Sequence, residues 1–236
     1  MNQRMAFTMS SKNAITFKPL GDQAILAYLP DESSASRFAA SVRGAAFPWL
    51  EDVVPAYASV GIHYDGDRVQ SADVLTALKG LRPARASAVV GALRVIPCCY
   101  EMQLDLNRVA EHKSLSTDQV IALHSGIEYA IHAIGFAPGF PYLGYLPPEL
   151  TGVPRLPSPR LRVEPGSVGL TGKQTGVYPQ ARPGGWNLIG RTPLVLVDVN
   201  DNYFPLRVGD RVSFKRVDEA EFQRLAGERL PLSRGV

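Results

Sequence analysis

The sequence GSVGLTGKQTGVYP, residues 166–179, alternates short apolar runs with glycines and ends in a proline. The same character extends from Gly135 to Gly190, where glycine and proline are dense and short apolar runs lie between turn residues. Many short strands with glycine-rich corners are typical of a closed or nearly closed β-barrel. We therefore predict a β-barrel in the C-terminal part of the chain, with strands at Val168–Thr171, Leu194–Val199 and Arg211–Phe214.

Before Gly135 the pattern changes, and helices are expected between the strands. Ser116 precedes Gln119 by three residues, which fits a capping box at the start of a helix. The other elements expected in this part of the chain are strands at Ala92–Cys98 and Glu128–Ile134, helices at Asp105–His112 and Gln119–His124, and a short last helix at Glu219–Leu225.

The first 86 residues predict a separate small α+β domain. Two helices against one antiparallel sheet form a ferredoxin-like arrangement. The expected elements are strands at Ala14–Lys18, Ala24–Tyr28, Val53–Ala56 and Ser59–Tyr64, with helices at Ser33–Phe47 and Ser71–Leu81. Residues 82–88, RPARASA, are small and polar and are the best linker candidate. We therefore expect an α+β domain at residues 1–86 and the β-barrel domain at residues 87–236.

Composition excludes several classes of protein. Of the 236 residues, 45% are apolar and 20% are charged, which is the balance of a folded protein, and the net charge is only +3. Basic residues are scattered, so no nucleic-acid surface is expected. No apolar run is long enough to span a membrane. Met1–Phe17 lacks the apolar core of a signal peptide, and we expect a cytoplasmic protein.

The segment GFAPGFPYLG, residues 135–144, combines two prolines with glycines. Prolines fix φ and glycines permit positive φ, so the segment should form a stiff loop that presents Phe136, Phe140 and Tyr142. Such a loop either covers the mouth of the barrel or forms one wall of a ligand pocket. Both interpretations stay open at this stage.

Two further segments, residues 163–179 and 182–193, place polar and aromatic side chains among glycines. Backbone amides at such glycines can form an anion-binding nest, and Arg191 or Arg160 could bind a carboxylate or phosphate through two parallel bonds. The alternative is that the glycines are barrel corners, that Trp186 belongs to the core and that the arginines are solvated.

Several catalytic motifs are absent from the sequence. Residues 167–174, SVGLTGKQ, resemble a phosphate-binding P-loop, but Ser167 replaces its first glycine and Gln174 replaces the Ser or Thr that should follow the lysine. ATP binding in another geometry stays open. The four histidines show no metal-ligand spacing, so no metal site is expected. His124, at the end of a predicted helix, could be merely a cation that stabilises the helix dipole.

Residues 135–144, 165–179 and 184–193 together resemble the allophanate hydrolase subunit 1 family, to which KipI-like proteins also belong. The similarity runs from FKPLGD at residues 17–22 to VGDRV at residues 208–212, nearly the whole chain. The resemblance implies a cyclophilin-like β-barrel behind the small α+β domain. It also implies a partner chain of the allophanate hydrolase subunit 2 type, which is the C subunit in 5-oxoprolinase.

The function implied by the resemblance is that of a non-autonomous subunit of an ATP-dependent 5-oxoprolinase, which converts 5-oxo-L-proline to L-glutamate. ATP, with magnesium, would be a co-substrate of the complex, and a third polypeptide, the A subunit, would open the lactam. His124 is then the candidate for proton transfer. The residues expected to bind substrate are Phe136, Pro138, Phe140, Tyr142, Arg160, Gln174, Thr175, Tyr178, Trp186 and Arg191.

Two other functions are compatible with the same resemblance. A KipI-like protein would bind a sensor histidine kinase and inhibit it without catalysis. A carboxyltransferase half of a urea carboxylase-type enzyme would need biotin from another chain, because this sequence has no Met-Lys-Met biotin-attachment motif.

Overall fold

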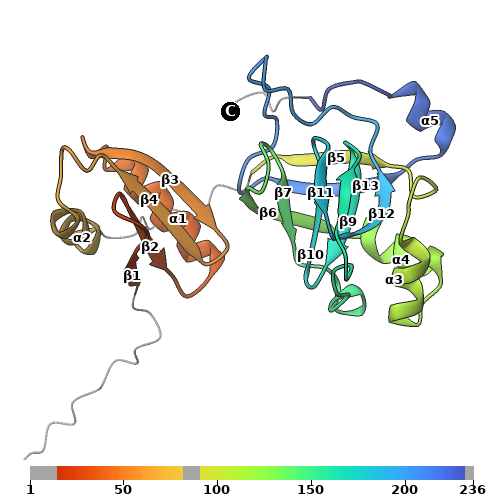
Figure 1. Cartoon of the computed structure of the whole chain (residues 1–236), viewed down its shortest axis with the longest axis horizontal. Helices are drawn as coiled ribbons and strands as arrows, with labels where there is room; N and C mark the ends of the chain where they lie inside the picture. Colours follow the sequence, from red (N-terminus) through yellow and green to blue (C-terminus); the bar gives the residue numbers. More distant parts are fainter. Residues whose placement is uncertain (1–14, 82–90, 232–236) are drawn as a thin grey trace, which may run out of the picture. The chain divides into compact units, whose positions relative to one another are not determined.

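The computed structural model describes residues 15–81 and 91–231. The chain divides into two compact units, Met1–Val89 and Val90–Val236, which are described separately (Figure 1). The predicted linker and the predicted boundary after residue 86 lie outside the described residues, as does most of the segment considered as a signal peptide.

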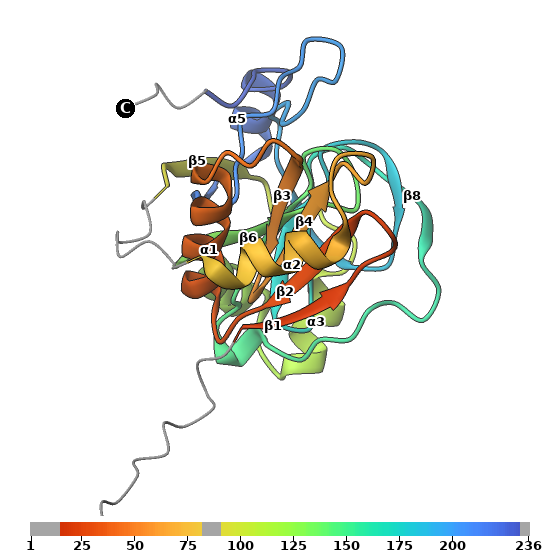
Figure 2. The same cartoon turned by 90° about the vertical axis from the view of Figure 1, so that its left-hand side faces the viewer.

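The N-terminal unit is a four-stranded antiparallel sheet with two helices packed on one face, as Figure 2 shows. Strand residues Ile25, Val60 and Ile62 point to that face and pack with Phe38 and Leu78 of the helices. The elements are β1 (Thr16–Pro19), β2 (Ala24–Tyr28), α1 (Glu32–Gly44), β3 (Leu50–Ala56), β4 (Ser59–Tyr64) and α2 (Ser71–Gly80), with the strand order β1-β2-β4-β3.

The ferredoxin-like prediction for this unit is not confirmed. A ferredoxin-like domain has the element order βαββαβ. Residues 15–81 have the order ββαββα, and the edge position beside β2 is occupied by β1, which precedes β2 in the chain. The helices and the sheet were predicted from local periodicity, but the order of strands depends on long-range pairing that periodicity does not encode.

The C-terminal unit is built on a seven-stranded sheet that curls into a nearly closed barrel (Figure 1). Cys99 and Arg191 close the ring through one antiparallel bridge, in which each backbone N–H donates to the other residue's carbonyl at 2.8 and 2.9 Å. All neighbouring strands are antiparallel except β5 and β13. The order is β12 (Asn187–Arg191), β9 (Ser167–Thr171), β10 (Gln174–Val177), β7 (Pro141–Gly144), β6 (Glu128–Ile134), β13 (Arg211–Arg216) and β5 (Leu93–Cys98).

A second, two-stranded sheet pairs β8 (Arg160–Val163) with β11 (Arg182–Gly184), and we call it the ribbon. Two helices, α3 (Leu106–Lys113) and α4 (Thr117–Ser125), lie at one end of the barrel, and α5 (Glu219–Arg224) lies at the other (Figures 1 and 2). A short 3-10 helix, η2, spans Pro148–Leu150. The predicted capping box of α4 is confirmed, because Ser116 and Gln119 exchange side-chain to backbone hydrogen bonds.

The predicted strand at Leu194–Val199 is wrong. Within it, Val195 and Asp198 form only isolated bridges. The Asp198 carboxylate accepts hydrogen bonds from the backbone N–H groups of residues 200 and 201, and this turn interrupts the extended chain. Leu196 is nevertheless buried in the barrel core, so the apolar run was a sign of burial and not of a strand.

Candidate functional site

Five of the predicted binding residues form one aromatic cluster in the C-terminal unit: Phe136, Phe140, Tyr142, Tyr178 and Trp186. The Phe140 ring lies at the centre of this aromatic cluster, with its centroid 5.2 Å from that of Tyr178 and 5.5 Å from that of Trp186. Trp186 is buried, as the core interpretation expected, whereas the side chain of Phe136 is 59% exposed. The cluster therefore combines a fixed interior with an exposed edge.

A tight turn holds the exposed edge of the aromatic cluster in place. Phe136 and Gly139 both have positive φ, at 67° and 73°, and the Gly135 N–H donates to the Phe140 carbonyl at 3.1 Å. A Cβ on Gly139 would lie 2.0 Å from a methyl group of Val197, so only glycine fits there. Pro138 lies at the exposed tip of this turn. The predicted loop is present and exposes Phe136, but Phe140 is buried and Tyr142 lies partly buried on β7.

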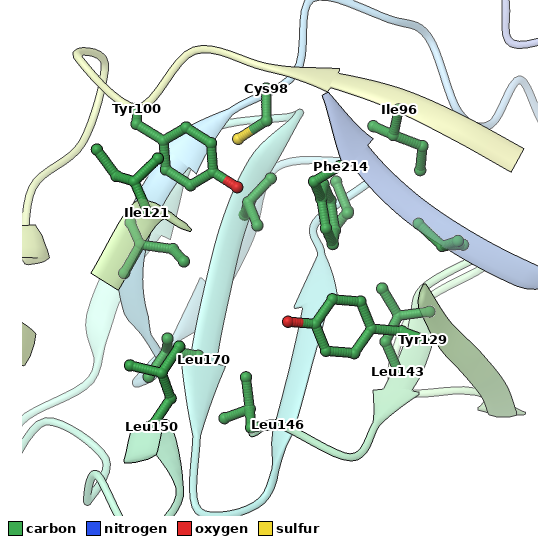
Figure 3. Packing of buried hydrophobic residues seen from close by; sticks show 14 of the residues in the cluster. Ile96, Cys98, Tyr100, Ile121, Tyr129, Leu143, Leu146, Leu150, Leu170 and Phe214 are labelled. Atoms are coloured by element: carbon green, nitrogen blue, oxygen red, sulfur yellow. The ribbon is translucent and has the colours of Figure 1, made fainter. Parts of the chain in front are cut away.

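His124 and Thr175 meet inside the barrel and not at its surface. The Tyr100 hydroxyl lies 2.8 Å from Nδ1 of His124, and Nε2 lies 2.9 Å from the hydroxyl of Thr175, which in turn donates to the Gly169 carbonyl. The Tyr129 hydroxyl donates to the carbonyl of His124 at 2.8 Å. Figure 3 shows the Tyr100 and Tyr129 hydroxyls turned toward the barrel interior.

Burial determines the charge of His124. The residue is fully buried, and desolvation lowers its pKa from 6.5 to about 3, so the ring is neutral at neutral pH. The interpretation of His124 as a dipole-stabilising cation is therefore wrong, because its ring is turned into the core and not toward water. The sequence analysis did not identify the polar partners of His124, because Tyr100 and Thr175 lie 24 and 51 residues away along the chain.

Arg160 is held by a buried carboxylate. Its Nη2 lies 2.8 Å from Oδ1 of Asp105, and the other carboxylate oxygen accepts the backbone N–H of Leu188 at 2.7 Å. Asp105 is only 5% exposed, so the pair anchors the ribbon to the barrel strand β12. Arg160 therefore already has an anionic partner within the protein, one that sequence reasoning did not identify.

Arg191 lies apart from the aromatic cluster and lines two cavities, of about 420 and 370 Å³. Its Nε donates to the carbonyl of Pro165 at 2.9 Å, and its guanidinium carbon lies 6.0 Å from the ring centroid of Phe222. None of the other predicted binding residues lines either of these two cavities. Phe222 was not identified from the sequence, because nothing local links the helix that contains it to Arg191.

Gln174 is placed on β10, opposite Gly144 of β7, and is partly buried. The predicted binding residues are thus dispersed among the aromatic cluster with its Pro138 turn, the barrel interior with His124 and Thr175, and the cavities at Arg191, while Arg160 and Gln174 lie outside all three places. Within residues 15–81 and 91–231, no group of three or more histidine, cysteine, aspartate or glutamate side chains is arranged to hold a metal ion. Over the same residues, no helix is long and apolar enough to cross a membrane.

Comparison with known proteins identifies the family. The family model described as carboxyltransferase domain, subdomain C and D, matches residues 15–206. The chain is 35% identical over 224 residues to the 5-oxoprolinase B subunit of Bacillus subtilis (strain 168), a match that covers 86% of this chain and 93% of that relative. The resemblance inferred from the motifs is therefore confirmed.

Solved structures share the fold of this chain. The crystal structure of TTHA0988 matches with a TM-score of 0.70 and 39% identity, covering 79% of this chain but only 37% of that longer chain. The Kluyveromyces lactis urea carboxylase, at 17% identity and a TM-score of 0.72, shares the fold over 93% of this chain, which corresponds to 23% of its own length. The chain belongs to the family of the carboxyltransferase domain, subdomain C and D.

Proposed function

We propose that this chain is the B subunit of a 5-oxoprolinase, and that it acts with a C subunit of the allophanate hydrolase subunit 2 type and with a lactam-opening polypeptide, the A subunit. The observation that carries the proposal is the 35% identity to a 5-oxoprolinase B subunit over 86% of this chain. The complex would convert 5-oxo-L-proline to L-glutamate in an ATP-dependent reaction.

The chemistry explains why such a reaction would need ATP. An unactivated lactam is a poor electrophile, because its nitrogen lone pair is delocalised into the carbonyl. Transfer of the γ-phosphoryl group of magnesium-bound ATP to the amide oxygen would release ADP and make the ring carbon open to attack by water. Cleavage of the ring C–N bond then frees the amine and leaves an acyl phosphate. A second water hydrolyses the acyl phosphate to the new carboxylate and phosphate.

This chain's own residues would bind and orient the substrate. Arg191 has a fixed guanidinium group on the wall of a cavity, which suits an anionic group of the substrate. The aromatic cluster lines neither cavity at Arg191, so we assign it no direct contact with the substrate. We assign His124 a positioning role through Thr175 and no direct proton transfer, because its ring is fully buried and its pKa is lowered to about 3.

The ribbon is the surface that we propose contacts the partner polypeptide. Within the described part of the chain, each strand of this two-stranded sheet has one edge without a neighbouring strand, and free edges are ready sites for pairing with another chain. Leu161 on β8 is 92% exposed, while Val163 of the same strand packs under the aromatic cluster. Two of the three arginines of the ribbon, Arg160 and Arg162, are paired with Asp105 and Glu164, so a partner surface with an apolar pocket for Leu161 would complement it.

Reconstitution tests the proposal. This chain is co-expressed with the C and A subunits, and glutamate and ADP are measured with and without 5-oxo-L-proline. The expected result is glutamate formation that requires ATP and all three chains. The control omits this chain and should show no turnover. A stable three-chain complex that hydrolyses no 5-oxo-L-proline would reject the proposal.

A further inference from the structure

The smaller of the two cavities at Arg191 is formed where the ends of the glycine-rich segments meet. Its volume is about 370 Å³. Pro165 comes from the start of one segment, Pro179 from its end, and residues 191–193 from the end of the next. The remaining walls are Leu194, Val195, Phe222, Ala226 and Gly227. Three prolines give this cavity rigid apolar walls.

Among the described residues that line this smaller cavity, Arg191 is the one that carries a charge. The larger cavity on the other side of Arg191 is lined by two arginines, Arg162 and Arg191, and by three glutamates, Glu101, Glu164 and Glu219. Arg162 there is already paired with Glu164, at 2.6 Å. An anion is therefore favoured in the smaller cavity and opposed by carboxylates in the larger one.

The guanidinium of Arg191 is held in one orientation by two contacts. Nε donates to the Pro165 carbonyl at 2.9 Å, and the ring of Phe222 lies 6.0 Å from the guanidinium carbon. No described residue is hydrogen-bonded to Nη1 or Nη2, so this edge can present two parallel donors to a carboxylate. Arg191 also bridges the barrel through its backbone, which fixes the base of its side chain.

From this geometry we infer that the proline-walled cavity at Arg191 binds a small cyclic carboxylate, with the carboxylate on the guanidinium edge and the ring against Pro165, Pro193 and Phe222. The inference rests on the proposed function for its ligand, 5-oxo-L-proline. It adds that the substrate's carboxylate is recognised by this chain and that the aromatic cluster is not the carboxylate site.

The test compares ligands that differ only in the carboxylate. Binding of 5-oxo-L-proline and of 2-pyrrolidinone, which has the same lactam ring without the carboxylate, is measured on the full chain by ligand-observed NMR and calorimetry. The wild type should bind 5-oxo-L-proline about 10- to 100-fold more tightly, the range expected for a hydrogen bond to a charged group. Arg191→Gln should remove this preference, and Arg191→Lys should retain part of it.

The control is Arg162→Gln, which removes an arginine from the larger cavity and should leave the preference unchanged. Melting temperatures of all variants exclude unfolding as the cause. The inference is overturned if the wild type shows no preference for the carboxylate ligand, or if Arg191→Gln keeps the preference. These binding measurements do not require turnover. If Arg191→Gln keeps the preference for 5-oxo-L-proline while the three-chain complex is active, this site is rejected and the proposed function stands.

Discussion

At the scale of single residues, His124 is a base that the fold keeps neutral. Its folded pKa of about 3 lies below its ordinary value of 6.5 because burial disfavours the charged ring. Well above pH 6.5 the ring is neutral in both the folded and the unfolded chain and contributes nothing to the pH dependence. Below that value only the unfolded chain binds the proton, so stability falls as the pH drops.

We therefore expect His124 to account for a loss of roughly 2 kcal/mol in the free energy of unfolding between about pH 7.5 and about pH 5. His124→Gln, which introduces a side-chain amide for hydrogen bonding but does not titrate, should remove this loss from the change in unfolding free energy between the two pH values. Urea unfolding in a Trp49→Phe background measures it, because Trp186 fluorescence then reports the barrel. Equal slopes with and without His124 would contradict the assignment.

Asp105 is the second residue whose burial leads to a prediction. Asp105→Asn removes the charge that pairs with Arg160 at 2.8 Å and weakens the acceptor of the Leu188 N–H. Because Arg160 is partly solvated, the expected loss in unfolding free energy is about 1–3 kcal/mol, measured by urea unfolding. Asp118→Asn is the matched control: that carboxylate is exposed and lies 3.5 Å from Arg216, so its loss should be close to zero. Similar losses in both variants would contradict the anchoring role of Asp105.

The features that the sequence predicted at this scale are set by residues that lie close together along the chain. The capping box at Ser116 and the stiff loop at residues 135–144 follow from residues a few positions apart. The pairing of Arg160 with Asp105 spans 55 residues, and no pattern in one sequence reports it. Consequently, the sequence identified residue types that are suited to binding, but it did not predict that the fold disperses them over separate places in the C-terminal unit.

At the scale of elements, β11 packs closely against the aromatic cluster through Gly184. A Cβ added there would lie 2.4 Å from the Tyr178 hydroxyl oxygen and 2.8 Å from the ring carbon beside it. Tyr178 is buried and cannot move aside, so Gly184→Ala should destabilise the barrel by about 1–3 kcal/mol. The neighbouring Gly185→Ala meets only ordinary contacts, at 3.7 Å from Pro159, and serves as the control.

Differential scanning calorimetry of the two alanine variants measures the difference. A lower transition temperature for Gly184→Ala than for Gly185→Ala is the expected result. If both variants melt like the wild type, the close packing between β11 and Tyr178 does not stabilise the ribbon.

Strands were predicted where apolar runs stop at turn residues, and this was sufficient for β6, which spans the predicted residues Glu128–Ile134. It was insufficient at Leu194–Val199, where burial and the Asp198 turn produce an apolar segment without ladder pairing. The closure of the barrel through Cys99 and Arg191 could not be predicted, because one bridge between residues 92 positions apart leaves no periodic trace.

At the scale of the whole molecule, this chain corresponds to part of longer relatives, since it spans 37% of the TTHA0988 chain. Exposed apolar side chains on the C-terminal unit, among them Phe136 and Leu161, are therefore candidates for contact with further polypeptide. Leu161 offers the clearest test, because at 92% exposure its replacement should leave the fold unchanged.

Leu161→Asp should weaken binding of the C-subunit partner at least about tenfold, because a carboxylate would replace a side chain that loses its water in the interface. Affinity is measured by biolayer interferometry with the full chain immobilised. Val199→Asp, on an exposed turn at a residue 53% exposed, is the matched control and should bind normally. Leu161→Arg keeps the basic character of the ribbon but still removes the apolar contact, so it should also bind weakly. Normal binding by both Leu161 variants would exclude the ribbon as the partner surface.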